Sequence, residues 1–270
     1  MIRLNGQLLE VGSFGDGTLK CNAPRVLPVG NGKFDAKTVT WCYDNDSEIF
    51  TLICLVDYLK EHYPNAPRKL LLPYIPHARQ DREVSGRLFT LKSFAKIINS
   101  LDFTEVEYFD PHSDVSKALI DRGMFIYSPF MVAYQDYAVM YPDAGAAKKY
   151  GEAEGVNNPI IGNKHRNEEG RITSYELLNF VEGTKKVIIR DDICSYGGTF
   201  VAAAKELRKR GVEEIILVVT HCENNILKGE VFDYIDRVFT TDSILTVSHP
   251  KITIARKFRE EQKCIELTLY

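Results

Sequence analysis

The chain has 270 residues, 44% hydrophobic and 26% charged, which is the balance of a folded protein of one large or two ordinary domains. Its formal net charge is -3, and it has no long basic run, so nucleic acid is not expected as a partner. The longest apolar run, Ile49–Val56, is too short to span a bilayer, so no membrane partner is expected either. Six cysteines without a CxxC pair and no signal-peptide pattern favour a reduced, cytoplasmic protein.

Short apolar runs alternate with amphipathic segments along the chain. In chain order the patterns predict a helix at Val56–Pro64, a strand at Lys69–Ile75, a helix at Leu91–Leu101, a strand at Thr104–Asp110, a strand at Lys186–Asp192, a helix at Thr199–Gly211 and a strand at Glu213–His221. The last three form a strand–helix–strand unit with two buried, parallel strands.

This alternation predicts an α/β fold in which each domain is a largely parallel sheet flanked by helices. We expect two domains, residues 1–130 and 131–270, joined near Ser128–Ala138. Ligands of open parallel sheets bind beyond the carboxyl ends of the strands. The candidate site residues are therefore the polar clusters that follow the expected strands.

The first cluster, Arg190–Phe200, places two carboxylates, Asp191 and Asp192, at the end of a buried strand. A turn of small, hydroxyl and aromatic residues then opens a helix: Ser195, Tyr196, Gly197, Gly198 and Thr199. Glycines allow close approach of a ligand to the backbone, and the N–H groups at a helix start favour an anion. The alternative is a polar strand end with an ordinary helix cap, but the complete strand–turn–helix context favours a binding loop.

The second cluster follows the strand expected at Lys69–Ile75 and contains Arg79, Gln80 and Asp81. An amide such as Gln80 can contact a base edge, and a guanidinium such as Arg79 can stack on a base or meet a phosphate. By composition alone, a solvated loop is the better interpretation of this segment.

Two further strand ends carry groups suited to metal or phosphate. Asp110 and His112 flank a proline, and both can serve a metal, although a lone histidine is usually structural. Asp143 precedes a small-residue stretch and is equally typical of a helix cap. Downstream, Lys164 and Arg166 can reach a transferring phosphate, although such basic runs are most often solvated.

In this order the clusters resemble the ribose-phosphate pyrophosphokinases (PRPP synthetases). The motifs that carry the resemblance are F-x-D-G-E at Phe14–Gly17, A-R-Q-D-[RK] at Ala78–Arg82, D-L-H at Asp110–His112, S-P-D-x-G-x at Tyr141–Ala146 and D-D-x-x-D-T-x-G-T at Asp191–Thr199. Each motif is weak alone, whereas the ordered set, extending from Phe14 to Ile244, is specific.

The resemblance implies two phosphoribosyltransferase-like domains, an ATP co-substrate and Mg²⁺. It implies that the β,γ-diphosphate of ATP moves to the anomeric hydroxyl of ribose 5-phosphate, giving PRPP and AMP. The roles it implies are ATP binding by Phe14, Asp16, Arg79, Gln80, Asp81 and His112, metal binding by His112, Asp110 and Asp143, charge stabilisation by Lys164, Arg166, Arg87 and His112, and ribose-phosphate binding by Asp191, Asp192 and the loop Ser195–Thr199. It also implies a homo-oligomer built from dimers, because Phe14 and Asp16 belong to a stretch that reaches a neighbouring subunit's ATP.

Three departures from the family pattern bear on the substrate. Thr18 replaces the glutamate of F-x-D-G-E, the loop after the A-R-Q-D-[RK] motif keeps Arg87 as its main cation, and Ser195-Tyr196 replaces D-T in the phosphate loop. The last change favours an altered 5-phosphate pocket. A larger acceptor with the same ribose phosphate end, such as ADP-ribose, is therefore an alternative, and its product would be an ADP-ribose pyrophosphate suited to NAD salvage. A phosphoribosyltransferase and a non-catalytic regulatory homologue are further alternatives.

Overall fold

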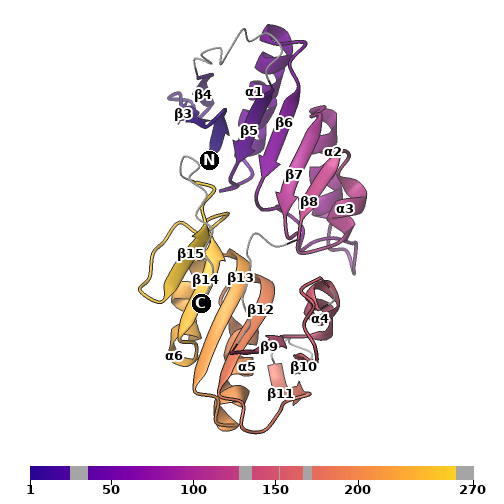
Figure 1. Ribbon diagram of the computed structural model, residues 1–270. Coiled ribbons are helices and arrows are strands. Elements are labelled where there is room, and N and C mark those ends of the chain that lie inside the picture. Colours follow the sequence, from indigo (N-terminus) through magenta and orange to yellow (C-terminus); the bar gives the residue numbers. More distant parts are fainter. Residues whose placement is uncertain (25–35, 128–135, 152, 167–171, 260–270) are drawn as a thin grey trace. The chain divides into compact units, whose positions relative to one another are not determined.

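A computed structural model of the chain describes residues 1–24, 36–127, 136–151, 153–166 and 172–259. These residues form two compact units (Figure 1), the first from the N-terminal half together with Phe258 and Arg259, and the second from the C-terminal half up to Lys257. The boundary expected near Ser128–Ala138 falls mostly on residues outside the described ranges.

The N-terminal unit contains a six-stranded sheet in the order β2-β1-β5-β6-β7-β8 and a separate β3–β4 hairpin. Its elements are β1 Ile2–Leu4, β2 Gln7–Leu8, β3 Glu10–Ser13, β4 Leu19–Asn22, β5 Lys37–Trp41, α1 Glu48–His62, β6 Arg68–Leu72, α2 Thr90–Ser100, β7 Glu105–Phe109, α3 Val115–Leu119 and β8 Gly123–Ile126. Strands β5 to β8 are mutually parallel, whereas β1 is antiparallel to both of its neighbours. Helical crossovers join the parallel strands, as right-twisted parallel sheets require.

The C-terminal unit contains a seven-stranded sheet in the order β11-β10-β9-β12-β13-β14-β15. Its elements are β9 Ala138–Tyr141, α4 Ala144–Tyr150, β10 Ile160–Arg166, β11 Ile172–Leu178, β12 Lys186–Cys194, α5 Gly198–Lys209, β13 Glu214–Cys222, the 3-10 helix η1 Asn224–Lys228, α6 Val231–Tyr234, β14 Arg237–Thr241 and β15 Ile252–Arg256. All neighbours pair in parallel except β10 and β11, which form an antiparallel pair.

The expected secondary structure is largely confirmed. The predicted strand–helix–strand unit is β12–α5–β13, and Gly211, with φ +83°, ends the helical segment as its position predicted. The helix expected at Val56–Pro64 is longer than predicted, because α1 already begins at Glu48. The apolar run Ile49–Val56 lies inside this helix, where Leu52 and Leu55 contribute to its buried stripe.

Each sheet has its own hydrophobic core. In the N-terminal unit, Trp41, Leu52 and Leu70 are fully or almost fully buried within one cluster of β5, α1 and β6 side chains. In the C-terminal unit, Val187, Ile189 and Leu217 pack against apolar residues of α5. Phe258 returns to the N-terminal unit, where its ring lies 4.9 Å from that of Phe109, a contact that the predicted domain division did not include.

Candidate functional site

The carboxyl edge of the C-terminal sheet carries the densest group of candidate residues. Strand β9 lies between β10 and β12. After β9 the chain adds β10 and β11 on one side of the sheet, and from β12 onward it adds strands on the other side, so the strand order switches between β9 and β12. Such a switch point is where open α/β sheets bind ligands. Asp143 follows β9, and the pair Asp191 and Asp192 lies near the end of β12. The strand runs to Cys194, two residues beyond its predicted end at Asp192, so the pair lies within the strand as predicted.

Asp143 has two partners that come from different elements. Its Oδ1 accepts from the backbone N–H of Ala146 at 3.0 Å, which caps α4, and its Oδ2 lies 2.7 Å from Nζ of Lys164 on β10. Burial opposes ionisation, but the hydrogen bonds from Lys164 and the cap lower the pKa of Asp143. Asp143 thus caps α4 through Oδ1 and pairs with Lys164 through Oδ2, so the cap does not exclude the predicted site role. The backbone of Arg166 ends β10, and its side chain lies outside the described part of the chain.

Tyr175 on β11 is a neighbour of Asp143 that sequence reasoning missed. Its hydroxyl donates to the carbonyl oxygen of Pro142 at 2.8 Å. Burial, followed by the charges of Asp143 and Asp191, raises the pKa of Tyr175. A Cβ on Gly162 would lie 2.0 Å from Oη of Tyr175, so only glycine leaves room for this side chain. Nothing in the local sequence of β11 distinguished Tyr175 from any other strand tyrosine.

The two carboxylates of β12 are in different surroundings. Asp192 is 5% exposed, and its Oδ2 lies 3.6 Å from Nζ of Lys149 on α4. Burial and then the neighbouring charge of Asp192 raise the pKa of Asp191 well above its ordinary value. Two carboxyl groups this close together are stabilised when a cation or hydroxyl donors bind to them. A sugar ligand would provide such hydroxyl donors.

The residue before the acidic pair, Arg190, is completely buried. Its Nε lies 3.0 Å from Oε1 of Glu154, and its guanidinium lies 4.1 Å from the ring centroid of Tyr150. Tyr141 adds a hydrogen bond to Glu154 at 3.3 Å. This cluster joins the segment that follows α4 to β12 and holds the strand beneath Asp191.

The predicted binding loop is a tight turn that opens α5. Gly197 has φ +78°, and a Cβ there would lie 2.1 Å from Cγ2 of Val231, so this position requires glycine for two reasons. A Cβ on Gly229 would likewise lie 2.1 Å from the carbonyl oxygen of Tyr196. The segment after β13 therefore packs tightly against the loop. Tyr196 is 55% exposed.

Glu223 is a second residue that the sequence did not reveal. Ser195 Oγ donates to Oε2 of Glu223 at 2.5 Å, and Nδ2 of Asn225 donates to the same oxygen at 3.1 Å. The backbone N–H of Glu223 donates to the carbonyl of Cys194 at 2.8 Å. The carboxylate of Glu223 is thus fixed at the start of the loop, although the two residues are separated by the whole α5–β13 segment.

In the N-terminal unit, two of the residues predicted to bind the nucleotide, Gln80 and Asp81, form hydrogen bonds to other side chains of the same unit. Oε1 of Gln80 accepts from the hydroxyl of Thr90 at 3.1 Å. Asp81 accepts from Ser113 at 2.6 Å and pairs with Arg82 at 2.8 Å. Chiefly through the Arg82 hydrogen bonds, the pKa of Asp81 falls to about 2. Asp81 therefore organises the loop in this structure, whereas Arg79 is exposed at its surface.

Asp110 and His112 differ sharply in accessibility. Asp110 directly follows β7, is fully buried and has φ +37°, whereas His112 is exposed. Of the two, His112 is the one that a ligand can reach. Within the described ranges, His, Cys, Asp and Glu side chains nowhere gather in threes as a metal cage would need.

The remaining predicted residues lie in two exposed turns. Arg87 closes a turn in which its N–H donates to the carbonyl of Val84 at 2.9 Å, with positive φ at Ser85 and Gly86. Phe14 is 56% exposed at the tip of the β3–β4 hairpin. Asp16 accepts from the N–H and hydroxyl of Thr18 at 3.0 and 2.7 Å. Thr18, which departs from the family pattern, therefore stabilises the hairpin turn.

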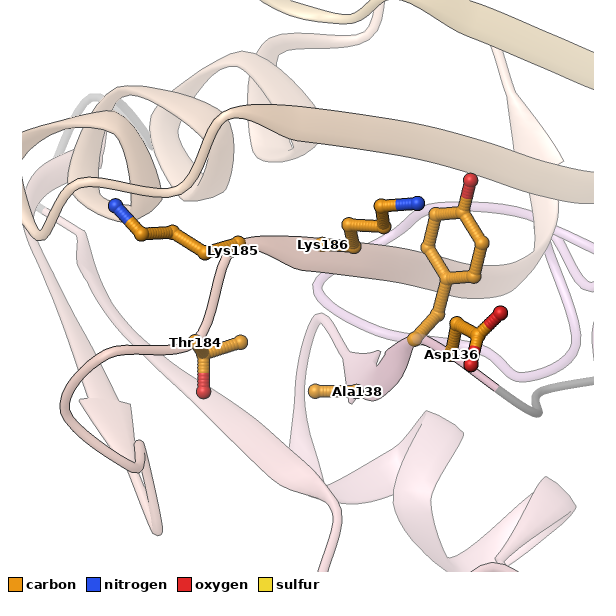
Figure 2. A pocket seen from close by; sticks show the side chains of 6 residues that line it. Asp136, Ala138, Thr184, Lys185 and Lys186 are labelled. Carbon is orange, nitrogen blue, oxygen red and sulfur yellow. The ribbon is translucent and has the colours of Figure 1, made fainter.

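A shallow depression of about 450 Å³ lies at the other end of the C-terminal sheet (Figure 2), lined by Asp136, Tyr137, Ala138, Thr184, Lys185 and Lys186. Its two lysines are balanced by acids, since Lys185 lies 2.7 Å from Glu213 and Lys186 lies 3.8 Å from Glu214. It adjoins the amino ends of β9 and β12, away from the predicted residues.

Comparison with known proteins agrees with this geometry. A model of the phosphoribosyl transferase domain matches residues 139–252, which contain the switch point and the binding loop. The ribose-phosphate pyrophosphokinase of Thermosipho africanus (strain TCF52B) is 26% identical over 250 residues, covering 87% of this chain and 78% of that protein. The ribose-phosphate pyrophosphokinase of Marinomonas sp. (strain MWYL1) is 27% identical over 257 residues, covering 81% of this chain and 80% of that protein.

The chain is thus similar to ribose-phosphate pyrophosphokinases over most of its length, and residues 139–252 match the phosphoribosyl transferase domain. Its fold is similar to that of a solved structure: the crystal structure of phosphoribosylpyrophosphate synthetase from Mycobacterium smegmatis matches with a TM-score of 0.71 at 19% identity, covering 92% of this chain and 85% of that one. No helix within the described ranges has the length and apolarity needed to pass through a membrane.

Proposed function

We propose that the protein is an ATP-dependent diphosphokinase that acts on the anomeric hydroxyl of a ribose 5-phosphate unit. The observation that carries the proposal is the carboxyl edge of the C-terminal sheet, where the acidic pair of β12 lies beside the Asp143–Lys164 ion pair and the loop that opens α5. Similarity to the relatives above supports the same reaction, since they are named ribose-phosphate pyrophosphokinases.

The loop and the acidic pair suit the two ends of a ribose phosphate. Backbone N–H groups of Gly198 and Thr199 at the start of α5 are suited to the 5-phosphate, because a helix start favours an anion. Asp191 and Asp192 are suited to accept hydrogen bonds from ribose hydroxyls. On this assignment the ribose lies along the carboxyl end of β12.

The nucleotide is assigned to the N-terminal unit by the family motif. The exposed Arg79 is assigned to the base or a phosphate of ATP, Gln80 to the base, and His112 to the phosphates. Phe14 and Asp16, at the tip of the exposed β3–β4 hairpin, are assigned to the ATP of a neighbouring copy. We therefore propose a homo-oligomer in which the hairpin completes another subunit's site.

The oxygen-rich donors of the site suit Mg²⁺. Magnesium commonly binds through one or two carboxylates together with substrate phosphates, and the closely held pair Asp191 and Asp192 offers such carboxylates. Asp143 on the ribose side and His112 on the nucleotide side are further candidate ligands, and Asp110 is less suited because it is fully buried. When bound, magnesium would neutralise charge on the diphosphate.

In the proposed reaction, the anomeric oxygen of the ribose bonds to the β-phosphorus of ATP. The bond between that phosphorus and the oxygen it shares with the α-phosphate breaks, AMP leaves with that oxygen, and the hydroxyl proton passes to solvent. Diphosphoryl transfer depends mainly on positioning and charge stabilisation. Lys164, Arg166 and Arg87 are the cations that we assign to this stabilisation.

The acceptor has two candidates. Ribose 5-phosphate, giving PRPP, follows from the family. ADP-ribose, giving an ADP-ribose pyrophosphate, is favoured by one observation: the loop carries Tyr196, which is 55% exposed. An aromatic face at this position can stack on a group attached beyond the 5-phosphate.

Incubating the purified chain with ATP, Mg²⁺ and either acceptor tests the proposal. The expected result is AMP release that depends on an acceptor, with the diphosphorylated product identified by mass spectrometry. AMP release with ribose 5-phosphate alone would exclude the second acceptor, and release with ADP-ribose alone would exclude the first. Acceptor-independent ATP hydrolysis, or no AMP at all, would contradict the proposed reaction.

Two rival functions have observations of their own. The match of residues 139–252 to the phosphoribosyl transferase domain is also what a phosphoribosyltransferase would give, and conversion of PRPP and a base without ATP would establish that activity. The loop around Arg87 has few cations, which is also what a non-catalytic homologue would have. That reading predicts that Asp191→Asn and His112→Ala change no ATP-dependent turnover.

A further inference from the structure

The segment assigned to the nucleotide begins at a residue with an unusual backbone. His77 has φ +64°, a left-handed conformation that a residue with a Cβ rarely adopts. Its carbonyl oxygen accepts from the N–H of Gln80 at 2.9 Å, so the turn that follows contains Arg79 and ends at Gln80. The direction in which the side chains of Arg79 and Gln80 leave the backbone therefore depends on the conformation of His77.

Contacts from two other segments hold the side chain of His77. Its Nε2 lies 2.9 Å from Oδ1 of Asp46, in the segment between β5 and α1. A carboxylate only accepts hydrogen bonds, so the imidazole donates through Nε2. The His77 ring also packs against Phe94 of α2, with 5.6 Å between the ring centroids. These contacts fix the side chain where only the left-handed backbone conformation of His77 places it.

Asp46 is itself held in place from both sides. The hydroxyl of Tyr43, just after β5, donates to the same Oδ1 at 3.0 Å. Burial, followed by this hydrogen bond, raises the pKa of Tyr43 to about 12, so the hydroxyl keeps its proton at neutral pH. The carbonyl oxygen of Asp46 accepts from the N–H of Ile49 at 3.1 Å, in the first turn of α1. The carboxylate that contacts His77 is thus anchored to the end of β5 and the start of α1.

The other residues of the turn have ordinary supports. Ala78 is fully buried in the core of the unit. Oε1 of Gln80 accepts from Thr90, and the carbonyl oxygen of Gln80 accepts from the N–H of Leu91 at 3.3 Å. His77 differs from them because its backbone conformation is disfavoured and persists only when surrounding contacts compensate for it. Without the bond to Asp46, a return to negative φ would redirect the turn and its side chains.

We propose that Asp46 and His77 are positioning residues that hold Arg79 and Gln80 in place for the nucleotide. The inference rests on the proposed assignment of the nucleotide to this segment, and it goes further by naming the pair that sets the conformation of the segment. A segment that is fixed before the ligand arrives loses less conformational freedom on binding. Loss of the Asp46–His77 bond is therefore expected to weaken nucleotide binding and to leave ribose 5-phosphate binding unchanged.

Titration calorimetry with Mg²⁺ and the α,β-methylene analogue of ATP measures nucleotide affinity without turnover, because the analogue lacks the oxygen bridge that the reaction breaks. Asp46→Ala removes the acceptor for His77 and is expected to weaken binding about ten-fold, the effect of one hydrogen bond to a charged group. Asp46→Asn keeps an oxygen acceptor and is expected to weaken binding about three-fold or less. Asp57→Ala, at an exposed position of α1, is the matched control and is expected to bind like the wild type.

A glycine variant shows whether the backbone of His77 is what Asp46 controls. Glycine adopts positive φ without strain, so the turn of His77→Gly does not need the contact with Asp46. In that background Asp46→Ala is expected to change nucleotide affinity by about two-fold at most, because the two substitutions act on one interaction. A role of Asp46 in stability alone would lower the melting temperature in both backgrounds and leave nucleotide affinity unchanged in both.

Three outcomes would overturn the inference alone. One is an Asp46→Ala variant that binds the analogue as the wild type does. Another is an equal loss in the wild-type and His77→Gly backgrounds, which would mean that Asp46 does not act through His77. The third is a parallel loss of ribose 5-phosphate affinity. A wild type that does not bind the analogue would contradict the proposed nucleotide site and the inference with it, whereas the expected affinities without AMP release from ATP would contradict the proposed reaction alone.

Discussion

Lys164 and Asp143 form an ion pair with 2.7 Å between Nζ and Oδ2, which joins β10 to the N-cap of α4. The other oxygen of Asp143 caps that helix. Because the ammonium is already paired with a carboxylate, a phosphate that it is to stabilise must compete with Asp143 or bind beside it. The Lys164 ammonium, which we assign to charge stabilisation during transfer, is thus held in a fixed position at the sheet edge.

Lys164→Gln is expected to lower the turnover number for AMP release about 100-fold or more, the effect of removing one preorganised charge donor from a transfer site. Acceptor affinity should change far less, since the acidic pair and the loop are untouched. Steady-state kinetics measure both quantities. Lys148→Gln, at an exposed position of α4, is the control, and equal losses in the two variants would remove Lys164 from the transfer step.

Tyr196→Ala separates the two acceptors. Loss of one stacking face weakens binding by ~1–3 kcal/mol when a base lies on it, so ADP-ribose should bind at least several-fold more weakly while ribose 5-phosphate is almost unaffected. Fluorescence or calorimetric titration of both ligands makes the measurement. Parallel weakening of both ligands would mean that Tyr196 shapes the loop and does not stack on a ligand.

Breaking the buried ion pair Arg190–Glu154 is expected to lower the free energy of unfolding strongly, whereas replacing both residues by apolar ones is expected to lower it much less. Glu154→Gln removes a charged partner from the buried guanidinium of Arg190, and the free energy of unfolding should fall by ~3–5 kcal/mol. Changing both residues to methionine should recover most of that loss, because two apolar side chains need no counter-charge. Urea unfolding of the two variants compares them, and a double variant no better than Glu154→Gln would contradict this account.

Gly162→Ala should destabilise the C-terminal unit by ~1–3 kcal/mol, since the added methyl group overlaps Tyr175 and the carbonyl of Pro142. Thermal unfolding gives the size of the effect. Gly12→Ala, at an exposed position with nothing within 4 Å of the added Cβ, controls for the change of residue type. Equal melting temperatures for the two variants would mean that the backbone at Gly162 shifts easily enough to accommodate the added methyl group.

The depressed pKa of Asp81, about 2 in the folded chain, sets the direction of a pH effect. A carboxyl group whose folded pKa lies below its unfolded value of ~3.9 stabilises the folded state above the unfolded pKa and loses that contribution as pH falls through the folded value. The wild type should therefore lose more stability than Asp81→Asn between about pH 4 and pH 2.

The effect at Asp81 should be small, at most ~1 kcal/mol, because its partner Arg82 is 71% exposed and solvent screens the pair. Urea unfolding at several pH values compares the two proteins. Identical pH slopes would mean that the hydrogen bonds to Asp81 persist in the unfolded chain or contribute nothing. Ser113→Ala, which removes the other donor, should reproduce part of the change.

Much of the architecture could be read from local pattern. The β12–α5–β13 unit was predictable because buried parallel strands are continuous apolar runs and α5 has helical spacing ended by Gly211. The start of α1 was misplaced by eight residues because its first half is apolar on several faces and lacks a clear period. The return of Phe258 to Phe109 had no local signal, since it joins positions at opposite ends of the chain.

The sequence by itself determined the α/β class, the family resemblance and the positions of the acidic pair and the glycine turn. These features depend on residues close together along the chain, where periodicity and turn chemistry act directly. Only the tertiary structure decided that Tyr175 lies beside Asp143, that Asp110 is buried, and that Glu223 accepts the proton of Ser195. Such contacts are set by strand register and crossovers, which bring together side chains that are far apart in the sequence. The residues next to each of them in the sequence give no signal of the contact.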